Sequence, residues 1–514
     1  MDPKGLLEDY AKRPSQKSWE WLRGVIAEAP EAEQPELIDA AATLLRDWPA
    51  RLLDGSGRRD DRVLSIHQRW AREIPEDSSL WKLVRSYTLS NPAKLPAQPL
   101  SELCVSGFSD NSSAVDSLLA WPHLGSLEVL RIEKWSDDDA EPFRRLLSGL
   151  GSDRLRGLHL IDVSPEATAA AGDVLLTKAW PRMSALSLGP ARIPSQTFQA
   201  LLRALGPELR ELSLSGRISR ELVGFVFQLC PKLETLQAGF DAGALTALTE
   251  GPGPSPVKVL RALGGKLGAE DCSALAQHLP ALESLELYNQ PIGDAGFLAL
   301  ARSETPSRLR VLRLRYCDLE KQGLEAWARQ DAAALAELDL TDNDELDAGA
   351  IVELCESPGA EHLRVLGLEA RKLRAADFER IARSPALAGL RSLALRSANL
   401  DKKTLESLLD SPAADGLETL ELSYASDGRR RLKDVRPFVN AKSLHRLRRL
   451  ALVGQKLSYA RGVVEDLAQS PYLKQLEELD LRENASEAPI DDDEIQELRE
   501  AGLPRLREVE SGAD

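Results

Sequence analysis

The sequence predicts an α/β solenoid, in which short parallel strands and helices alternate through about sixteen repeats, preceded by a small all-α unit. Two observations predict this fold. From residue 100 onward, the phrase apolar-x-x-apolar-x-apolar recurs sixteen times at spacings of 24 to 30 residues. Between successive phrases, apolar residues fall on one helical face. Self-similarity at such a period is typical of repeat architectures, in which each unit buries its apolar face against its neighbours.

Each phrase predicts one strand, because alternate apolar residues within it point to the same face of a sheet. The copies begin at Leu100, Leu127, Leu155, Met183, Leu209, Leu233, Val257, Leu282, Leu309, Leu335, Leu363, Leu390, Leu417, Leu447 and Leu476, with a degenerate copy at Leu506. Helices are predicted after the strands, for example over residues 292–301, 319–328, 348–355, 373–381 and 400–409.

The phrase resembles the leucine-rich repeat family, whose pattern is L-x-x-L-x-L-x-x-N/C-x-L. Cys317, Asn343 and Asn484 occupy the N/C slot of their copies. The resemblance covers roughly residues 97–512, and a helix in every repeat with a period near 27–29 residues is similar to the ribonuclease-inhibitor-like subtype. Strands stack about 4.8 Å apart, whereas helices approach no closer than about 8 Å, so the stack is expected to curve into a horseshoe with a concave sheet and convex helices.

Residues 1–92 lack the repeat and are predicted to form a helical unit, with residues 97–514 forming the solenoid. Helical stripes of apolar residues lie over residues 34–48, 63–74 and 80–87. Such a unit either caps the exposed edge of the first repeat or acts as a separate partner-binding or effector module. Both interpretations stay open at this stage.

Composition excludes several classes of function. The chain has 514 residues and a formal net charge of −16, which disfavours binding to nucleic acid or to anionic membranes. The five cysteines stand singly, which predicts free buried thiols rather than disulfides or zinc. No apolar stretch is long enough for a signal peptide or a membrane span. We therefore expect a cytoplasmic protein, of bacterial origin.

A search for catalytic motifs indicates no enzyme, no cofactor and no metal site. The histidines show no metal-ligand spacing, and the Gly264-Gly265-Lys266 turn lacks the first glycine and the Ser or Thr of a phosphate-binding loop. Cys272 and His278 fall on successive turns of one predicted helix, where a thiol at an apolar position is expected in the core.

The predicted binding surface is the concave sheet face of the C-terminal half. Tyrosine and arginine, the types enriched in binding hot spots, gather at strand positions that face away from the leucines. The candidate partner-binding residues are Glu286, Tyr288, Arg313, Arg315, Tyr316, Glu337, Asp339, Asp342, Glu369, Arg396, Glu421 and Tyr424.

These observations predict a non-catalytic interaction protein that serves as a scaffold, inhibitor or regulatory adaptor and binds a protein partner, expected to be basic. Two alternatives remain open. One is a GTPase-activating protein or another regulator of a small GTPase, acting through Arg313 or Arg315. The other is an effector whose N-terminal helical unit carries the activity.

Overall fold

The computed structural model describes most of the repeat region. The described residues are 37, 40–41, 86–89, 102–106, 111–133, 135, 140–161, 163–189, 194–251, 253–330, 332–398, 400–423, 435–455, 457, 460–484, 492–506 and 508–510. The chain divides into two compact units, of which the first is Met1–Gly216 with Gln228–Leu233 and the second is Arg217–Phe227 with Glu234–Asp514. This boundary lies inside the repeats, so the division predicted at residues 92–97 stays a prediction.

In the first unit, parallel strands alternate with helices. The strands are β1 (Ser86–Leu89), β2 (Glu102–Ser106), β3 (Val129–Glu133), β4 (Gly157–Ile161), β5 (Ala185–Leu188) and β6 (Glu211–Ile218), which reaches the boundary. The helices are α6 (Asn111–Ala120), α7 (Ala140–Gly149), α8 (Pro165–Thr177) and α9 (Ser195–Leu205), with short 3₁₀ helices η3 (Leu124–Ser126) and η4 (Gly206–Glu208). Each strand from β1 to β5 pairs in parallel with the next strand along the chain.

The N-terminal part departs from the all-α prediction. Strand β1 pairs with β2, with Tyr87 opposite Leu103, so the predicted helix over residues 80–87 is wrong at its end and the sheet begins before residue 97. Tyr87 and Thr88 are types that favour strands, and pairing with β2 supplies their hydrogen bonds. Leu37 and Ala41 are helical and buried as predicted, whereas the predicted helix over residues 63–74 lies outside the described residues.

The second unit continues the same alternation. Its strands are β7 (Thr235–Phe240), β8 (Val259–Gly265), β9 (Ser284–Tyr288), β10 (Val311–Arg315), β11 (Glu337–Leu340), β12 (Val365–Glu369), β13 (Ser392–Arg396), β14 (Thr419–Ser423), β15 (Arg449–Ala451), β16 (Glu478–Asp480) and β17 (Glu508–Glu510). Its helices are α10 (Arg220–Leu229, which crosses the boundary), α11 (Ala269–His278), α12 (Gly293–Ala301), α13 (Gln322–Ala328), α14 (Ala348–Glu356), α15 (Ala375–Arg383), α16 (Lys402–Leu409), α17 (Arg436–Asn440), α18 (Ala460–Ala468) and α19 (Asp492–Ala501). The 3₁₀ helices are η5 (Ala244–Glu250), η6 (Thr305–Ser307), η7 (Pro358–His362), η8 (Pro385–Gly389) and η9 (Lys442–Arg446).

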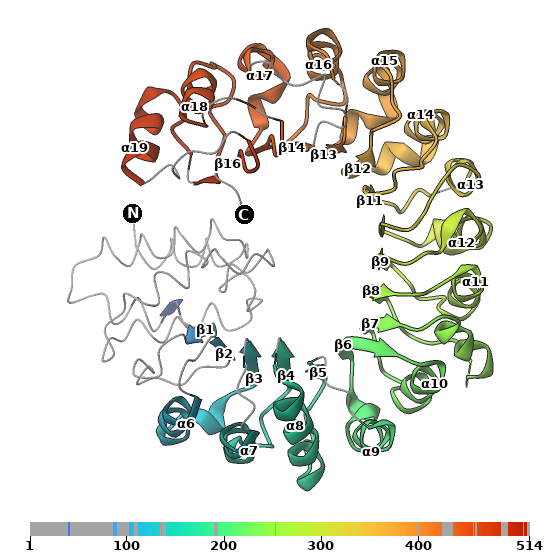
Figure 1. The fold of residues 1–514 in the computed structure, drawn as a ribbon, viewed down its shortest axis with the longest axis vertical. Helices are drawn as coiled ribbons and strands as arrows, with labels where there is room; N and C mark the ends of the chain where they lie inside the picture. The colour runs from blue at the N-terminus through green and yellow to red at the C-terminus, as the bar shows by residue number, and fades with distance from the viewer. Residues whose placement is uncertain are drawn as a thin grey trace. The chain divides into compact units, whose positions relative to one another are not determined.

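Strands β7 to β17 pair in parallel in chain order, and the helices of this unit lie on one side of them (Figure 1). The pairing is in phase with the repeat, so that Leu312 lies opposite Leu285 and Leu338. The repeated leucines fill the space between sheet and helices. The sheet face opposite the helices is called the open face below.

Asparagine in the predicted N/C slot joins neighbouring repeats through hydrogen bonds. Asn343 is 2 % exposed; its side-chain oxygen accepts from the backbone N–H of Cys317 at 2.9 Å, and its amide donates to the carbonyl of Leu314 at 2.7 Å. Asn484 bonds in the same way to Leu457 and Leu452. Each asparagine therefore satisfies backbone groups of the turn in the preceding repeat.

One repeat lacks the α-helix predicted for every repeat. After β7 the chain forms the 3₁₀ helix η5, which follows Gly243 at φ +70°. The Gly-Pro run over residues 251–256 limits this segment to seven residues, since proline removes donors and glycine adds backbone freedom. The buried Asp271 of α11 holds the segment by accepting from the N–H groups of Gly243 and Leu245.

Candidate functional site

The predicted side-chain alternation is present on the strands that carry the candidate residues. In β10, Leu312 and Leu314 are fully buried, whereas Val311, Arg313 and Arg315 are partly exposed on the open face. The same register runs through β9 and β11 to β14, which brings candidate residues from successive repeats side by side.

Oppositely charged residues form a chain of ion pairs across β8 to β11. Glu286 Oε2 lies 3.5 Å from Arg261 Nε and 3.4 Å from Arg313 Nη1. Arg313 Nε donates to Glu337 Oε1 at 2.5 Å. Each charge therefore faces an opposite charge on the neighbouring strand. Arg261 is a member that the sequence reasoning missed, although it precedes Glu286 by one repeat.

A second ion pair fixes the other arginine of β10. Arg315 Nη2 lies 2.5 Å from Asp339 Oδ2, and the opposite oxygen of Asp339 accepts from the hydroxyl of Thr341 at 2.7 Å. Asp339 is 7 % exposed, so removal of Arg315 would leave a buried charge without its cation. The positive charge of Arg315 is thus already matched within the chain.

Two tyrosines lie beside these ion pairs. The rings of Tyr288 and Tyr316 meet edge to face with centroids 5.6 Å apart, and their exposures are 42 % and 44 %. Among the described residues, the large hydrophobic side chains that stand exposed are these two and Leu176. A pair of exposed aromatic rings in contact is the kind of anchor that protein partners bury.

The backbone at Tyr316 is held in the left-handed region, with φ 51°, as is that of Asp342 with φ 63°. Both residues occupy the same place in their repeats, within two residues of the strand end, where Asn289 and Ser397 also have positive φ. Tyr316 hydrogen-bonds to the Asp342 side chain, and Asp342 Oδ1 lies 2.7 Å from Arg396 Nε. A bulky residue rarely adopts this conformation, so strain is stored at an exposed aromatic position.

Of the remaining candidates, two are glutamates and one lies outside the described residues. Glu369 at the end of β12 is 3 % exposed, which differs from the predicted surface position, and one of its oxygens has no hydrogen-bond partner. Burial raises the pKa of Glu369. A hydrogen bond with Ser397 acts to lower this pKa, and the negative charge of Asp344 acts to raise it further. Glu421 of β14 accepts from Ser423 at 2.6 Å. Tyr424 lies outside the described residues.

No catalytic constellation emerges around these residues. The five cysteines are free and buried as predicted, and burial raises the pKa of the Cys317 and Cys355 thiols to about 12. Burial also raises the pKa of Cys272, which opposes a nucleophilic role with His278.

Within the described ranges, no group of three or more His, Cys, Asp or Glu residues is arranged to hold a metal ion. Nor does any described helix combine the length and apolarity that a bilayer crossing requires.

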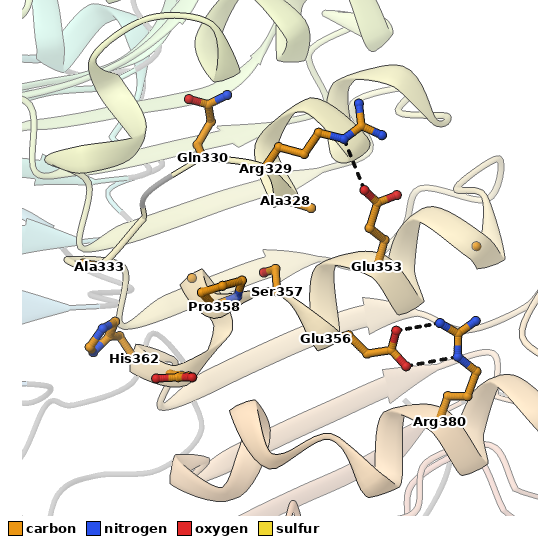
Figure 2. A pocket seen from close by; sticks show the side chains of 13 residues that line it. Ala328, Arg329, Gln330, Ala333, Glu353, Glu356, Ser357, Pro358, His362 and Arg380 are labelled. Atoms are coloured by element: carbon orange, nitrogen blue, oxygen red, sulfur yellow. Dashed lines mark hydrogen bonds and ion pairs between the residues drawn. The ribbon is translucent and has the colours of Figure 1, made fainter.

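A hollow of about 880 Å³ lies at the helical side of the second unit, where α13, α14 and η7 meet. Figure 2 shows two ion pairs among its lining side chains, Arg329 with Glu353 at 3.2 Å and Arg380 with Glu356 at 2.5 Å. These four groups are exposed and matched in charge, so they mark no ligand in the hollow. No motif in the sequence marks it.

Comparison with known proteins finds solved structures at low sequence identity. No family model matches the sequence, and no curated protein matches it. A chain of the yeast Rad7–Elc1 complex is 14% identical over 91% of this chain and 88% of that chain, with a TM-score of 0.40. A leucine-rich-repeat protein of Leptospira interrogans is 16% identical over 78% of this chain and 98% of that chain, with a TM-score of 0.34.

The class of the protein follows from its own repeats rather than from these likenesses. Strand-and-helix units with buried leucines in register, joined by Asn343 and Asn484, define an α/β repeat architecture. Its open face carries exposed aromatic rings and ion-paired arginines.

Proposed function

We propose that this chain is a non-catalytic, cytoplasmic, ribonuclease-inhibitor-like interaction protein whose repeats curve into a horseshoe. It binds a protein partner on the concave, open face of β9 to β14. The observation that carries the proposal is the Tyr288–Tyr316 pair, which is exposed, whereas the other described large hydrophobic side chains, Leu176 excepted, are buried or only partly exposed. A partner of ordinary interface size buries about 800 Å² per side, enough to cover both rings and the ion pairs beside them.

The state of the arginines favours binding over regulation of a GTPase. An arginine that stabilises the transition state of GTP hydrolysis must reach the phosphates of the bound nucleotide. Arg313 is held by Glu286 and Glu337, and Arg315 is held by Asp339. A single-turnover GTPase assay distinguishes the two functions, because an adaptor leaves the hydrolysis rate unchanged.

The double variant Tyr288→Ala/Tyr316→Asn tests the proposed face. Asparagine tolerates the left-handed backbone at position 316, and both substitutions leave the ion pairs of Arg313 and Arg315 in place. We expect the affinity for the natural partner, identified by affinity capture and measured by calorimetry, to fall at least about tenfold.

Leu176→Ala is the matched control, since Leu176 is exposed to 41 % on α8 of the first unit. It should leave the affinity unchanged. An unaltered affinity in the tyrosine variant would reject the proposed face. Deletion of residues 1–85, which spares β1, separately tests the alternative that the N-terminal unit carries the activity, since that alternative requires binding to be lost.

A further inference from the structure

The open face of the second unit has more carboxylates than its own arginines neutralise. Among the candidate residues that the structure describes, Arg313, Arg315 and Arg396 each pair with a carboxylate of this chain. Glu369 and Glu421 form no ion pair with another described residue. The two glutamates belong to β12 and β14, the strands on either side of β13.

The position of Glu369 is unfavourable in the free chain. Arg396 lies directly opposite Glu369 in the sheet register, yet its guanidinium binds Asp342 instead. The nearby Arg371 pairs with Asp344 at 3.2 Å. Glu369 therefore keeps a buried oxygen with neither a hydrogen bond nor a paired cation. Buried polar atoms in folded proteins nearly always have a hydrogen-bond partner, so this oxygen is a place where a ligand could supply one.

On β13, between the strands of the two glutamates, the open face carries the short side chain of Ala394 beside Arg396, whose guanidinium is held by Asp342. Ala394 of β13 is in register with Glu421 on one side and with Gly367 on the other, and it is partly exposed. A Cβ at position 367 would lie 2.7 Å from Oδ1 of Asp339, so a larger residue there would displace that carboxylate. Ala394 therefore lies beside Glu421 in the register and one register step from Glu369.

We infer that a lysine or arginine side chain of the partner docks over Ala394, between the carboxylates of Glu369 and Glu421. This inference rests on the proposed function and specifies the chemistry of the partner at one point. A rotation of the Glu369 side chain toward Ala394 gives its unpaired oxygen a hydrogen bond from the cation, and Glu421 adds the second negative charge. Charged hydrogen bonds of this kind are shorter and stronger than neutral ones.

Fluorescein-labelled hexalysine serves as the probe, with hexaglutamate as the probe of opposite charge, and anisotropy at low salt gives the affinity. Glu369→Gln/Glu421→Gln should weaken hexalysine binding about tenfold, because both carboxylates of the subsite are lost. Ala394→Leu should weaken it to a similar degree by filling the position without changing the charge. Hexaglutamate should bind to none of these chains.

Glu270→Gln/Glu320→Gln is the matched control, because it removes the same number of charges from exposed positions away from the open face. Its affinity for hexalysine should change less than about twofold, as expected for rim charges. The inference is overturned if this control weakens binding as much as the subsite variant, or if Ala394→Leu binds as the wild type does. The proposed function has its own test: it is rejected if Tyr288→Ala/Tyr316→Asn binds the natural partner as tightly as the wild type does.

Discussion

At the scale of single residues, His159 is a histidine placed beside a cation in the sheet. It lies half-buried in β4, with Nδ1 2.9 Å from the hydroxyl of Ser187 on β5 and with Arg131 opposite it on β3. Burial, and secondly the charge of Arg131, lowers the pKa of His159 to about 4. The ring is therefore neutral in the folded chain at physiological pH.

This neutral ring makes the first unit sensitive to acid. The unfolded chain binds a proton at His159 near pH 6.5, whereas the folded chain binds it only near pH 4, so stability falls as the pH drops between these values. The loss amounts to about 3 kcal/mol at most. We expect His159→Asn to flatten the dependence of the urea midpoint on pH between 7 and 4.5. His362→Asn, at an exposed site, should retain it, and identical profiles for His159→Asn and the wild type would contradict the assignment.

The burial and the ion pairing of side chains at the strand ends could not be fully predicted from the repeat pattern. The repeat predicts that Tyr288, Arg315 and Glu369 face away from the core, and for the first two this is confirmed. It does not predict that Arg396 passes over its register neighbour to bind Asp342, because that choice depends on side-chain rotamers and on the left-handed backbone at position 342. Glu369 is consequently buried and unpaired rather than exposed.

At the scale of elements, neighbouring helices are joined by Asp294 in the first turn of α12. Its carboxylate accepts from the backbone N–H groups of Glu320, Lys321 and Gln322, at 3.0, 2.9 and 2.6 Å, where α13 begins. Partial burial alone would raise the pKa of Asp294, but these donors outweigh it and hold the pKa below its usual value. One repeat thus caps the helix of the next.

Removal of this cap should destabilise the second unit. Asp294→Ala leaves the first N–H groups of α13 without their acceptor, which costs about 0.5–2 kcal/mol for a helix cap. We expect a lower urea midpoint and faster amide exchange over residues 320–323. Glu320→Ala, which removes an exposed side chain nearby, is the control, and equal effects of the two substitutions would show that Asp294 does not act as a cap.

The elements themselves were largely predictable, because leucine spacing determines which residues each repeat can bury. The strands after Leu282, Leu309 and Leu363, and the helices that follow them, lie within a few residues of their predicted ranges. The exceptions have local causes. The Gly-Pro run after η5 shortens one helix. Strand β1 forms because it pairs with the edge of β2, and residues 86–89 contain no repeat phrase that would predict this tertiary contact.

At the scale of the whole molecule, a net charge of −16 influences how fast a partner arrives. The sequence predicts this charge but not its local distribution, since the ion pairs of β8 to β11 neutralise most of the candidate surface. What remains is the surplus at Glu369 and Glu421. Long-range attraction therefore comes from the chain as a whole, whereas the final contact depends on these two carboxylates and on the two tyrosines.

Association with a basic partner should accordingly become slower as salt is added, because the Debye length falls from about 10 Å at 0.1 M to about 3 Å at 1 M. In stopped-flow measurements from 50 to 500 mM NaCl, we expect the association rate constant to fall steeply while the dissociation rate constant changes little. Tyr288→Ala/Tyr316→Asn should show the opposite signature, with faster dissociation and an unchanged salt slope, because it removes buried contact area and no charge. An association rate constant that is insensitive to salt would exclude electrostatic steering by this chain and, with it, the expectation of a basic partner.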